Sequence, residues 1–263
     1  MKRLHRYLGR ILLIILALFF MPVGCMVAAH YSADNRGGRS GDHHESTQQA
    51  PAAQPGEAVI QVYSARAARW RGAFGVHTWI ATRRTDEVRY TRLEVIGYRV
   101  YWGGNAVQIR TGEPDAKWFG NHPTLLRDLR GGERVNVLID HLRTAATDYP
   151  YNSTYHVWPG PNSNTFTAYL GRRVPELRLE LPSNAIGKDY LPGGSMLSRT
   201  PSGTGLQLSL GGYGGVMAGW EEGLEVNFLG LSAGIDLWPL ALKLPGVGRL
   251  GFSDLRRMHL HEP

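Results

Sequence analysis

Hydrophobic and polar positions divide the chain into three stretches with different patterns. Residues 11–29 are a run of 19 residues without a charge, which at about 1.5 Å per residue nearly spans a bilayer core of roughly 30 Å. Residues 31–56 show no apolar periodicity and are rich in Gly, Ser, Gln, Ala, Pro and charge, as in a flexible linker. From Glu57 onward, short apolar segments alternate with turn signals and indicate a folded body.

Within this body, apolar runs between turn signals predict strands. We expect them at residues 58–63, 75–81, 106–110 and 174–181, with one long strand or two short ones within 88–101. The spacing of the segments between residues 58 and 110 suggests antiparallel pairing.

Two segments have helical spacing instead. Residues 133–147 carry apolar side chains every three or four positions and predict an amphipathic helix. Residues 122–129 predict a shorter helix with Pro123 in its first turn.

The C-terminal part, residues 204–252, is rich in glycine and alternates apolar with polar residues. Glu221-Glu222-Gly223 predicts a hairpin turn between strands at 216–220 and 224–229. We expect a β-rich appendage that packs on the domain or lies near the membrane.

The net positive charge of the chain is concentrated at its N-terminus. Of the net charge of +7, four positive charges lie among the first ten residues, at Lys2, Arg3, Arg6 and Arg10. They flank the apolar run on one side only, which predicts a cytoplasmic N-terminus and an exported body. No basic cluster elsewhere indicates a nucleic-acid partner.

Three interpretations of the N-terminus stay open, and all of them export the body. The run 11–29 suits a membrane anchor, whereas residues 11–20 suit the apolar region of a cleaved signal peptide, because Pro22 and Gly24 weaken a helix beyond Phe20. Pro22-Val23-Gly24-Cys25 also resembles a lipoprotein signal, with Pro22 where that motif has Leu. Cys25 is the single cysteine of the chain, which excludes a disulfide framework within it and a Cys-based zinc site.

No cofactor or metal site is indicated. Asp42-His43-His44-Glu45 contains ligand types but lies in the linker, where ordering four neighbouring side chains around an ion is costly. We interpret it as a solvated segment.

One short stretch has the features of a nucleophile platform. Pro159-Gly160-Pro161 stiffens the approach to Asn162, a good N-cap, and residues 163–170 continue with helical spacing. Ser163 then lies in the first helical turn, at the positive end of the helix dipole. A serine needs a base, and His77 stands in the middle of a predicted strand that can hold it rigidly. The alternatives are a serine that only caps the helix and a buried histidine bonded to a backbone carbonyl.

Asn162-Ser163-Asn164-Thr165-Phe166 resembles the Asn-Cys-Glu-His-Phe segment of the lecithin retinol acyltransferase family, which belongs to the circularly permuted papain-like, or NlpC-type, group. The resemblance covers about residues 58–182 and implies that His77 matches the family's strand histidine and Ser163 its nucleophilic cysteine. The chain is also similar to a bacterial family catalogued as domain of unknown function 3750, from about residue 57 to its end. That similarity rests on His77 to Ile80, Glu94 to Gly97, Trp158 to Phe166 and Ala185 to Tyr190, and it brings no activity.

Serine in place of cysteine changes the chemistry that the resemblance implies. A hydroxyl is far less acidic than a thiol, so His77 would act as a true general base. Papain-like folds place the third polar group on the next strand, which here offers Tyr90, Arg92 and Glu94. Glu94 is the best partner of the imidazolium; a surface charge or an ion pair with Arg92 or Arg99 is its alternative role. The backbone N–H groups of Ser163 and Asn164 are candidates for an oxyanion site.

We therefore expect an α+β fold: a small antiparallel sheet with helices on one face in circularly permuted papain-like order, plus a β-rich C-terminal appendage. The expected parts are an N-terminal signal or anchor (1–30), a linker (31–56), the α+β domain (57–193) and the Gly-rich appendage (194–263). The expected function is a membrane-tethered, exported hydrolase or acyltransferase that acts on an amide or ester in the bacterial cell envelope. The alternative is a non-catalytic envelope protein that binds through the same cleft or is structural.

Overall fold

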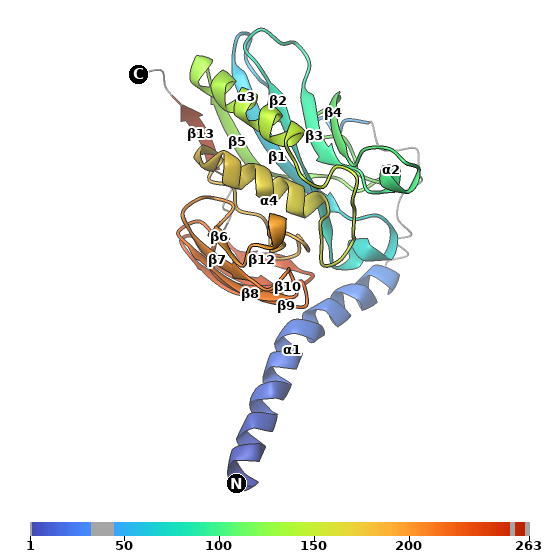
Figure 1. Ribbon diagram of the computed structural model, residues 1–263, viewed down its shortest axis with the longest axis vertical. Coiled ribbons are helices and arrows are strands. Elements are labelled where there is room, and N and C mark those ends of the chain that lie inside the picture. The colour runs from blue at the N-terminus through green and yellow to red at the C-terminus, as the bar shows by residue number, and fades with distance from the viewer. Residues whose placement is uncertain (1, 33–44, 253–255, 261–263) are drawn as a thin grey trace.

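The computed structural model describes residues 2–32, 45–252 and 256–260. It has a long N-terminal helix, a sheet covered by helices and a second, β-rich layer (Figure 1). This is the mixed α+β architecture expected from the sequence.

Helix α1 (Lys2–Ser32) includes the uncharged run and continues past Pro22 to its end. Within the described residues, His5–Ser32 is the one helix long and apolar enough to cross a membrane, and these properties fit a signal sequence equally well. The helix extends away from the rest of the molecule toward its N-terminus (Figure 1).

The first sheet has the strand order β13-β5-β1-β2-β3-β4. Its strands are β1 (Ala58–Arg66), β2 (Val76–Arg83), β3 (Thr91–Val95), β4 (Val107–Thr111), β5 (Thr124–Gly131) and β13 (Arg256–Leu260). All pairings are antiparallel except that of β13 with β5, which is parallel. The last described strand thus returns from the C-terminal part to the edge of the first sheet.

Helices α3 (Glu133–Thr147) and α4 (Ser163–Arg173) cover one face of this sheet (Figure 1). Their apolar sides share one core with the helix-facing residues of the strands, and this core includes Ile60 of β1, Leu93 of β3 and Phe166 of α4. Burial of these apolar sides stabilises both helices, since each fully buried large apolar side chain contributes about 1.5–3 kcal/mol. Helix α3 has the bounds that its hydrophobic spacing predicts.

Three expected elements were wrong. Residues 122–129 form no helix, because β5 occupies the sheet beside β1. Residues 174–181 form no strand: a 3₁₀ turn, η2 (Pro175–Leu177), is followed by irregular backbone, although Leu177, Leu179 and Leu181 are buried in the core. Within 88–101, only β3 is extended, and a short helix α2 (Tyr98–Tyr101) follows Gly97. Two further 3₁₀ turns are η1 (Arg69–Ala73) and η3 (Pro192–Gly194).

The second sheet is a meander of seven strands in which neighbours in sequence are neighbours in space. They are β6 (Leu197–Arg199), β7 (Gly205–Ser209), β8 (Gly214–Gly219), β9 (Gly223–Phe228), β10 (Leu231–Leu237), β11 (Leu240–Leu244) and β12 (Gly248–Gly251). The predicted hairpin is confirmed, with Gly223 paired to Gly219. Gly223 has φ 61°, which a side chain would strain.

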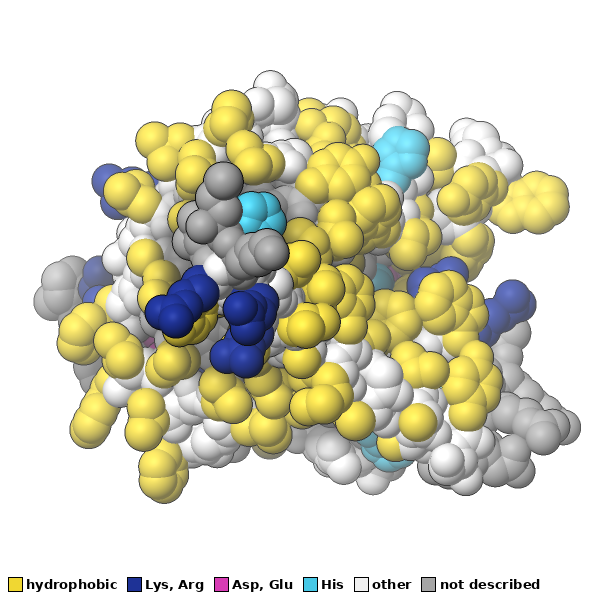
Figure 2. Space-filling model, turned by 90° about the horizontal axis from the view of Figure 1, so that it is seen from below, with side chains coloured by type: hydrophobic (Ala, Val, Ile, Leu, Met, Phe, Trp, Pro, Cys, Tyr) yellow, Lys and Arg dark blue, Asp and Glu magenta, His cyan; other side chains and the backbone are white. Residues whose placement is uncertain are grey.

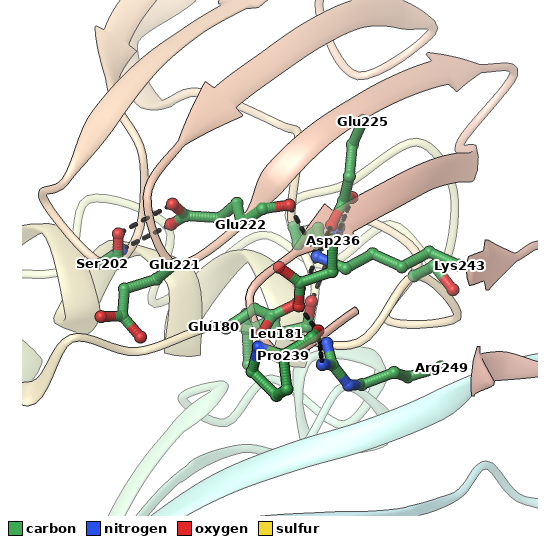
Figure 3. A network of polar contacts seen from close by, with 12 residues as sticks. Glu180, Leu181, Ser202, Glu221, Glu222, Glu225, Asp236, Pro239, Lys243 and Arg249 are labelled. Atoms are coloured by element: carbon green, nitrogen blue, oxygen red, sulfur yellow. Dashed lines mark hydrogen bonds and ion pairs between the residues drawn. The ribbon is translucent and has the colours of Figure 1, made fainter. Parts of the chain in front are cut away.

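Buried charges join the second sheet to the first domain (Figure 3). Lys243 of β11 is almost fully buried and contacts the carboxylates of Glu180 and Glu225. It also donates to the Glu222 carbonyl at 2.6 Å. Burial would lower the pKa of Lys243, but the two carboxylates outweigh it and raise the pKa well above its usual range. The two layers are therefore held together by an ion network and not only by apolar contact.

The last part of the expected linker is attached to the domain. Asp115 accepts hydrogen bonds from Ser46 and Thr47 and from the backbone N–H of Gln49. Burial would raise the pKa of Asp115, but these bonds lower it below its usual value. Residues 45–56 thus do not form a free tether, and residues 33–44, with Asp42, His43 and His44, lie outside the described part.

Candidate functional site

Ser163 is the first residue of α4, as the N-cap signal predicts. The Asn162 side chain accepts from the backbone N–H of Asn164 at 2.9 Å and of Thr165 at 3.1 Å. In return, the Thr165 hydroxyl accepts from the Asn162 N–H at 3.1 Å. This capping box satisfies the N–H groups that a helix start leaves without partners. It also engages the Asn164 N–H, which removes that group from the expected oxyanion site.

The same cap holds the segment that follows the domain core. Asn162 and Asn164 both donate from Nδ2 to the Ile186 carbonyl, and Thr165 donates to the Gly187 carbonyl. A Cβ on Gly187 would lie 2.2 Å from the Asn162 amide, so only glycine fits this approach. The two sequence segments, 158–166 and 185–190, are therefore parts of one structure.

Asn164 also fastens the start of α4 to β2. Its Nδ2 donates to the Val76 carbonyl at 2.9 Å, and its Oδ1 accepts from the Thr78 hydroxyl at 3.0 Å. Because β3 pairs with β2 only over residues 80–82, this end of β2 is open to the helix. The Asn164 amide therefore bonds the residues on both sides of His77, and Ser163 is the residue just before it.

His77 is held in a layer of aromatic rings. Its ring stacks on Trp118 with centroids 3.7 Å apart and planes 8° apart, and Trp79 lies 5.8 Å away. Since neighbouring side chains of a strand point to opposite faces, His77 lies on the face opposite to Thr78. His77 and Ser163 are each 5% exposed. The imidazole is thus rigidly oriented and largely shielded from water.

Glu94 of β3 lies beside His77, with 3.7 Å between its Oε2 and the histidine Nε2. The carboxylate is fully buried and accepts from Arg92 at 3.0 Å and from Arg110 at 2.8 Å. Burial would raise the pKa of Glu94, but Arg92, His77 and Arg110 outweigh it and hold the pKa at about 2. Glu94 is therefore an ionised carboxylate beside His77 and two arginines, and the ion pair with an arginine considered for it from the sequence is present.

The structure brings His77 and Glu94 into contact and fastens the residue after Ser163 to the residues that flank His77. Sequence reasoning missed two participants, Arg110 and Trp118, and it considered Asn164 only for its backbone N–H and not for its side chain. Arg92 was considered as an ion-pair partner of Glu94, with which it shares a strand face, and the structure adds that its guanidinium lies 4.6 Å from the Trp79 ring centroid. Trp118 had no local signal, since it comes from a loop between β4 and β5.

Two cavities lie elsewhere. One of about 440 Å³ opens between the two layers, beside Arg127, Glu180 and Lys243; the other, of about 300 Å³, lies beside Asp115 and the attached linker. Neither is lined by Ser163 or His77. Within the described residues, no three side chains of His, Cys, Asp or Glu are grouped to hold a metal ion.

The chain resembles a bacterial family mainly through two groups of residues. One group lies in segments 158–166 and 185–190, which meet at the α4 cap, and the other lies around the His77–Glu94 contact. No curated protein and no solved structure matches this chain. Residues 57–190 match the family described as protein of unknown function DUF3750, and the chain belongs to that family.

Proposed function

We propose that the protein is a membrane-tethered, exported hydrolase or acyltransferase that uses Ser163 and His77 on an amide or ester of the cell envelope. The observation that carries this proposal is the Asn164 amide, which bonds Val76 and Thr78 and so holds the first turn of α4 against the strand at His77. Serine activation requires a fixed helix N-terminus beside the strand, and it also requires that the His77 imidazole, on the face of β2 opposite to Thr78, reaches the Ser163 Oγ around the end of the strand.

In this reaction, His77 takes the Ser163 proton while Oγ attacks the carbonyl carbon. The leaving alcohol or amine recovers that proton from the imidazolium, and an acyl-serine forms. Water or a second acceptor then releases the acyl group. Glu94 stabilises the imidazolium, and its low pKa of about 2 keeps it charged throughout.

The order of the parts supports a permuted papain-like relationship. The strand with His77 precedes the strand with Glu94, and the helix that begins at Ser163 comes last. Export is supported by the basic residues at the start of α1, before its apolar run, which favour a cytoplasmic N-terminus. Retention of α1, its cleavage and lipidation at Cys25 are all compatible with an envelope location.

A binding protein is the second candidate, and one observation favours it. Ser163 and His77 are each only 5% exposed, so a substrate reaches them only if a covering side chain moves. A non-catalytic protein needs no such movement, and the cap would then serve only to hold residues 186–187.

A fluorophosphonate probe distinguishes the two. We expect the full chain in detergent to form a covalent adduct on Ser163, mapped by mass spectrometry, and Ser163→Ala to remove it. The matched control is Ser195→Ala, which changes an exposed serine outside the site and leaves the adduct intact. Absence of an adduct on the folded chain, or one that persists in Ser163→Ala, favours the binding protein.

A further inference from the structure

The second sheet has an unusual distribution of polarity. In β7 to β11 the inward positions are mostly polar and buried, for example Gln207, Glu225 and Lys243. The outward positions of the same strands are all apolar. A sheet with one face in water shows the opposite alternation, with its polar side chains outward. The outward face is therefore not built for water.

The register aligns these outward side chains into rows. One row crosses the sheet through directly paired residues: Leu206, Ala218, Leu224, Ile235, Leu242 and Leu250. Its large members are substantially exposed, with Leu224 at 56% and Leu242 at 45%. We call this surface the outward face. Contiguous apolar areas of such extent mark an interaction site.

Helix α1 already covers one part of the outward face. Phe19 is 4% exposed and packs on Leu231 and Ala233, which stand on the same side of β10 as the exposed Ile235. The Phe19 and Phe228 rings meet edge to face with centroids 5.7 Å apart. The apolar surface of the candidate membrane span is thus continuous with the outward face.

The position of this contact along α1 fixes its depth. Phe19 is nine residues after Arg10, the last charge before the apolar run, which is roughly 13 Å along a helix. A bilayer core is about 30 Å thick. If Arg10 marks the cytoplasmic boundary, Phe19 and the sheet beside it lie at the level of the acyl chains.

Tryptophans stand at one end of the sheet. Trp220 lies in the β8–β9 turn and Trp238 in the β10–β11 turn, and they are 67% and 71% exposed. Tryptophan is enriched where a protein passes from hydrocarbon to the headgroups. Seen from below, hydrophobic side chains spread over much of the molecule on the side from which α1 projects (Figure 2).

We propose that the outward face is a second membrane-binding surface, whose partner is the hydrocarbon core of the bilayer that α1 crosses. This inference takes the α1 span from the proposed function. The sheet then lies against the membrane beside the helix, and the first domain stands at a fixed height above the lipid.

Site-directed spin labelling in lipid vesicles tests the proposal with the full chain. Collision with oxygen reports hydrocarbon, and collision with a water-soluble nickel chelate reports water. The native Cys25 is exposed on α1 and carries the label for the span. Two other variants carry it after Cys25→Ser: Leu224→Cys on the outward face, and Val88→Cys, at a residue 89% exposed on the first domain, as the aqueous control. Leu242→Cys replaces Leu224→Cys if circular dichroism shows the latter to be misfolded.

We expect the label at residue 224 to match the one at Cys25, with high oxygen and low nickel accessibility, and the label at residue 88 to show the reverse. Nickel accessibility at residue 224 equal to that at residue 88 overturns the proposal. Protection from both reagents also overturns it, since the face would then be covered by protein, such as a second copy. A nickel-accessible Cys25 label, by contrast, contradicts the α1 span itself, so the two failures are distinguishable.

Discussion

Glu94 lies 3.7 Å from His77 while the same carboxylate pairs with Arg92 at 3.0 Å. The carboxylate thus has a structural partner and a candidate catalytic partner at once. Loss of its charge should affect both, and the two effects are measurable separately.

For stability, Glu94→Gln keeps the shape of the side chain but leaves the buried Arg92 without its counter-ion. A shift of the Glu94 pKa from 4.5 to about 2 corresponds to the order of 3 kcal/mol. Part of this is offset, because burial lowers the pKa of Arg92 despite Glu94. We expect Glu94→Gln to lower the free energy of unfolding by about 2–3 kcal/mol in denaturant titrations at pH 7.

The pH dependence has a definite sign. The folded pKa of Glu94 is depressed, so its contribution is complete above about pH 4.5 and is lost as the pH falls toward about 2. The unsubstituted chain should lose stability across this window more steeply than Glu94→Gln. Glu176→Gln, at an exposed carboxylate, is the matched control and should follow the unsubstituted chain. Parallel curves for all three chains would contradict the assigned ion pair.

The side-chain hydrogen bonds of Asn164, which fasten the start of α4 to β2, yield a second prediction. Asn164→Ala removes the bonds to Val76, Thr78 and Ile186, each worth about 0.5–1.5 kcal/mol. We expect a loss of about 2–3 kcal/mol in thermal unfolding, and faster hydrogen exchange at the start of β2. Thr78→Val removes one of these bonds and should cost about 1 kcal/mol. If Asn164→Ala lowers the stability no more than Thr78→Val does, the Asn164 side chain does not hold the start of α4 on β2.

The ion network between the layers also predicts a pH effect. Lys243→Met leaves the buried carboxylates of Glu180 and Glu225 without this cation and should cost about 3 kcal/mol or more. In the variant those carboxyl groups protonate at a higher pH, so its deficit relative to the unsubstituted chain should shrink as the pH falls. Lys243→Met combined with Glu180→Gln should recover part of the loss. A deficit independent of pH would contradict the network.

The second sheet should not be separable from the domain. A chain that ends at Pro192 loses β13 from the edge of β5 and leaves Lys188 without Glu225, with which it pairs at 2.5 Å. We expect it to aggregate, because a buried charge and an open sheet edge both become exposed. A chain that ends at Phe252 keeps the network and should remain in the detergent-soluble fraction with lowered stability. A soluble, cooperatively folded chain ending at Pro192 would show that the second sheet is an independent module.

The sequence predicted those elements whose local signals agree with their tertiary contacts. Helix α3 shows this, since its apolar stripe is its buried face, and so does α4, whose cap at Asn162 forms as expected. Strand β5 could not be predicted, because it carries charged residues inside a sheet. Asp128 is fully buried there only because Arg130 pairs with it at 3.0 Å. The tertiary environment thus overrides the local pattern.

For the candidate site, the sequence indicated the types of residue that could react but not the contacts between their side chains. Ser163, His77 and Glu94 were selected by residue type, strand position and resemblance. Nothing local indicates that Trp118 stacks on His77 or that Arg110 shares Glu94, because both contacts join segments far apart in the chain. Such contacts form only when the sheet and its loops assemble.

The last prediction concerns Ser163→Cys, made together with Cys25→Ser so that one thiol remains. A helix N-terminus lowers the pKa of a thiol, and a nearby imidazole lowers it further, from a free value of about 8.5. Thiolate absorbance in the ultraviolet measures this pKa without any reagent, so the measurement does not depend on reagent access to the buried site. We expect a midpoint at least one pH unit below that of free cysteine, and iodoacetamide labelling faster than free cysteine at neutral pH. His77→Gln in the same background should move the midpoint back up, while Ser195→Cys, at an exposed loop position, should titrate as an ordinary thiol. A midpoint at residue 163 that stays near 8.5 and ignores His77 means that this position activates no nucleophile, and the non-catalytic binding function would then be preferred.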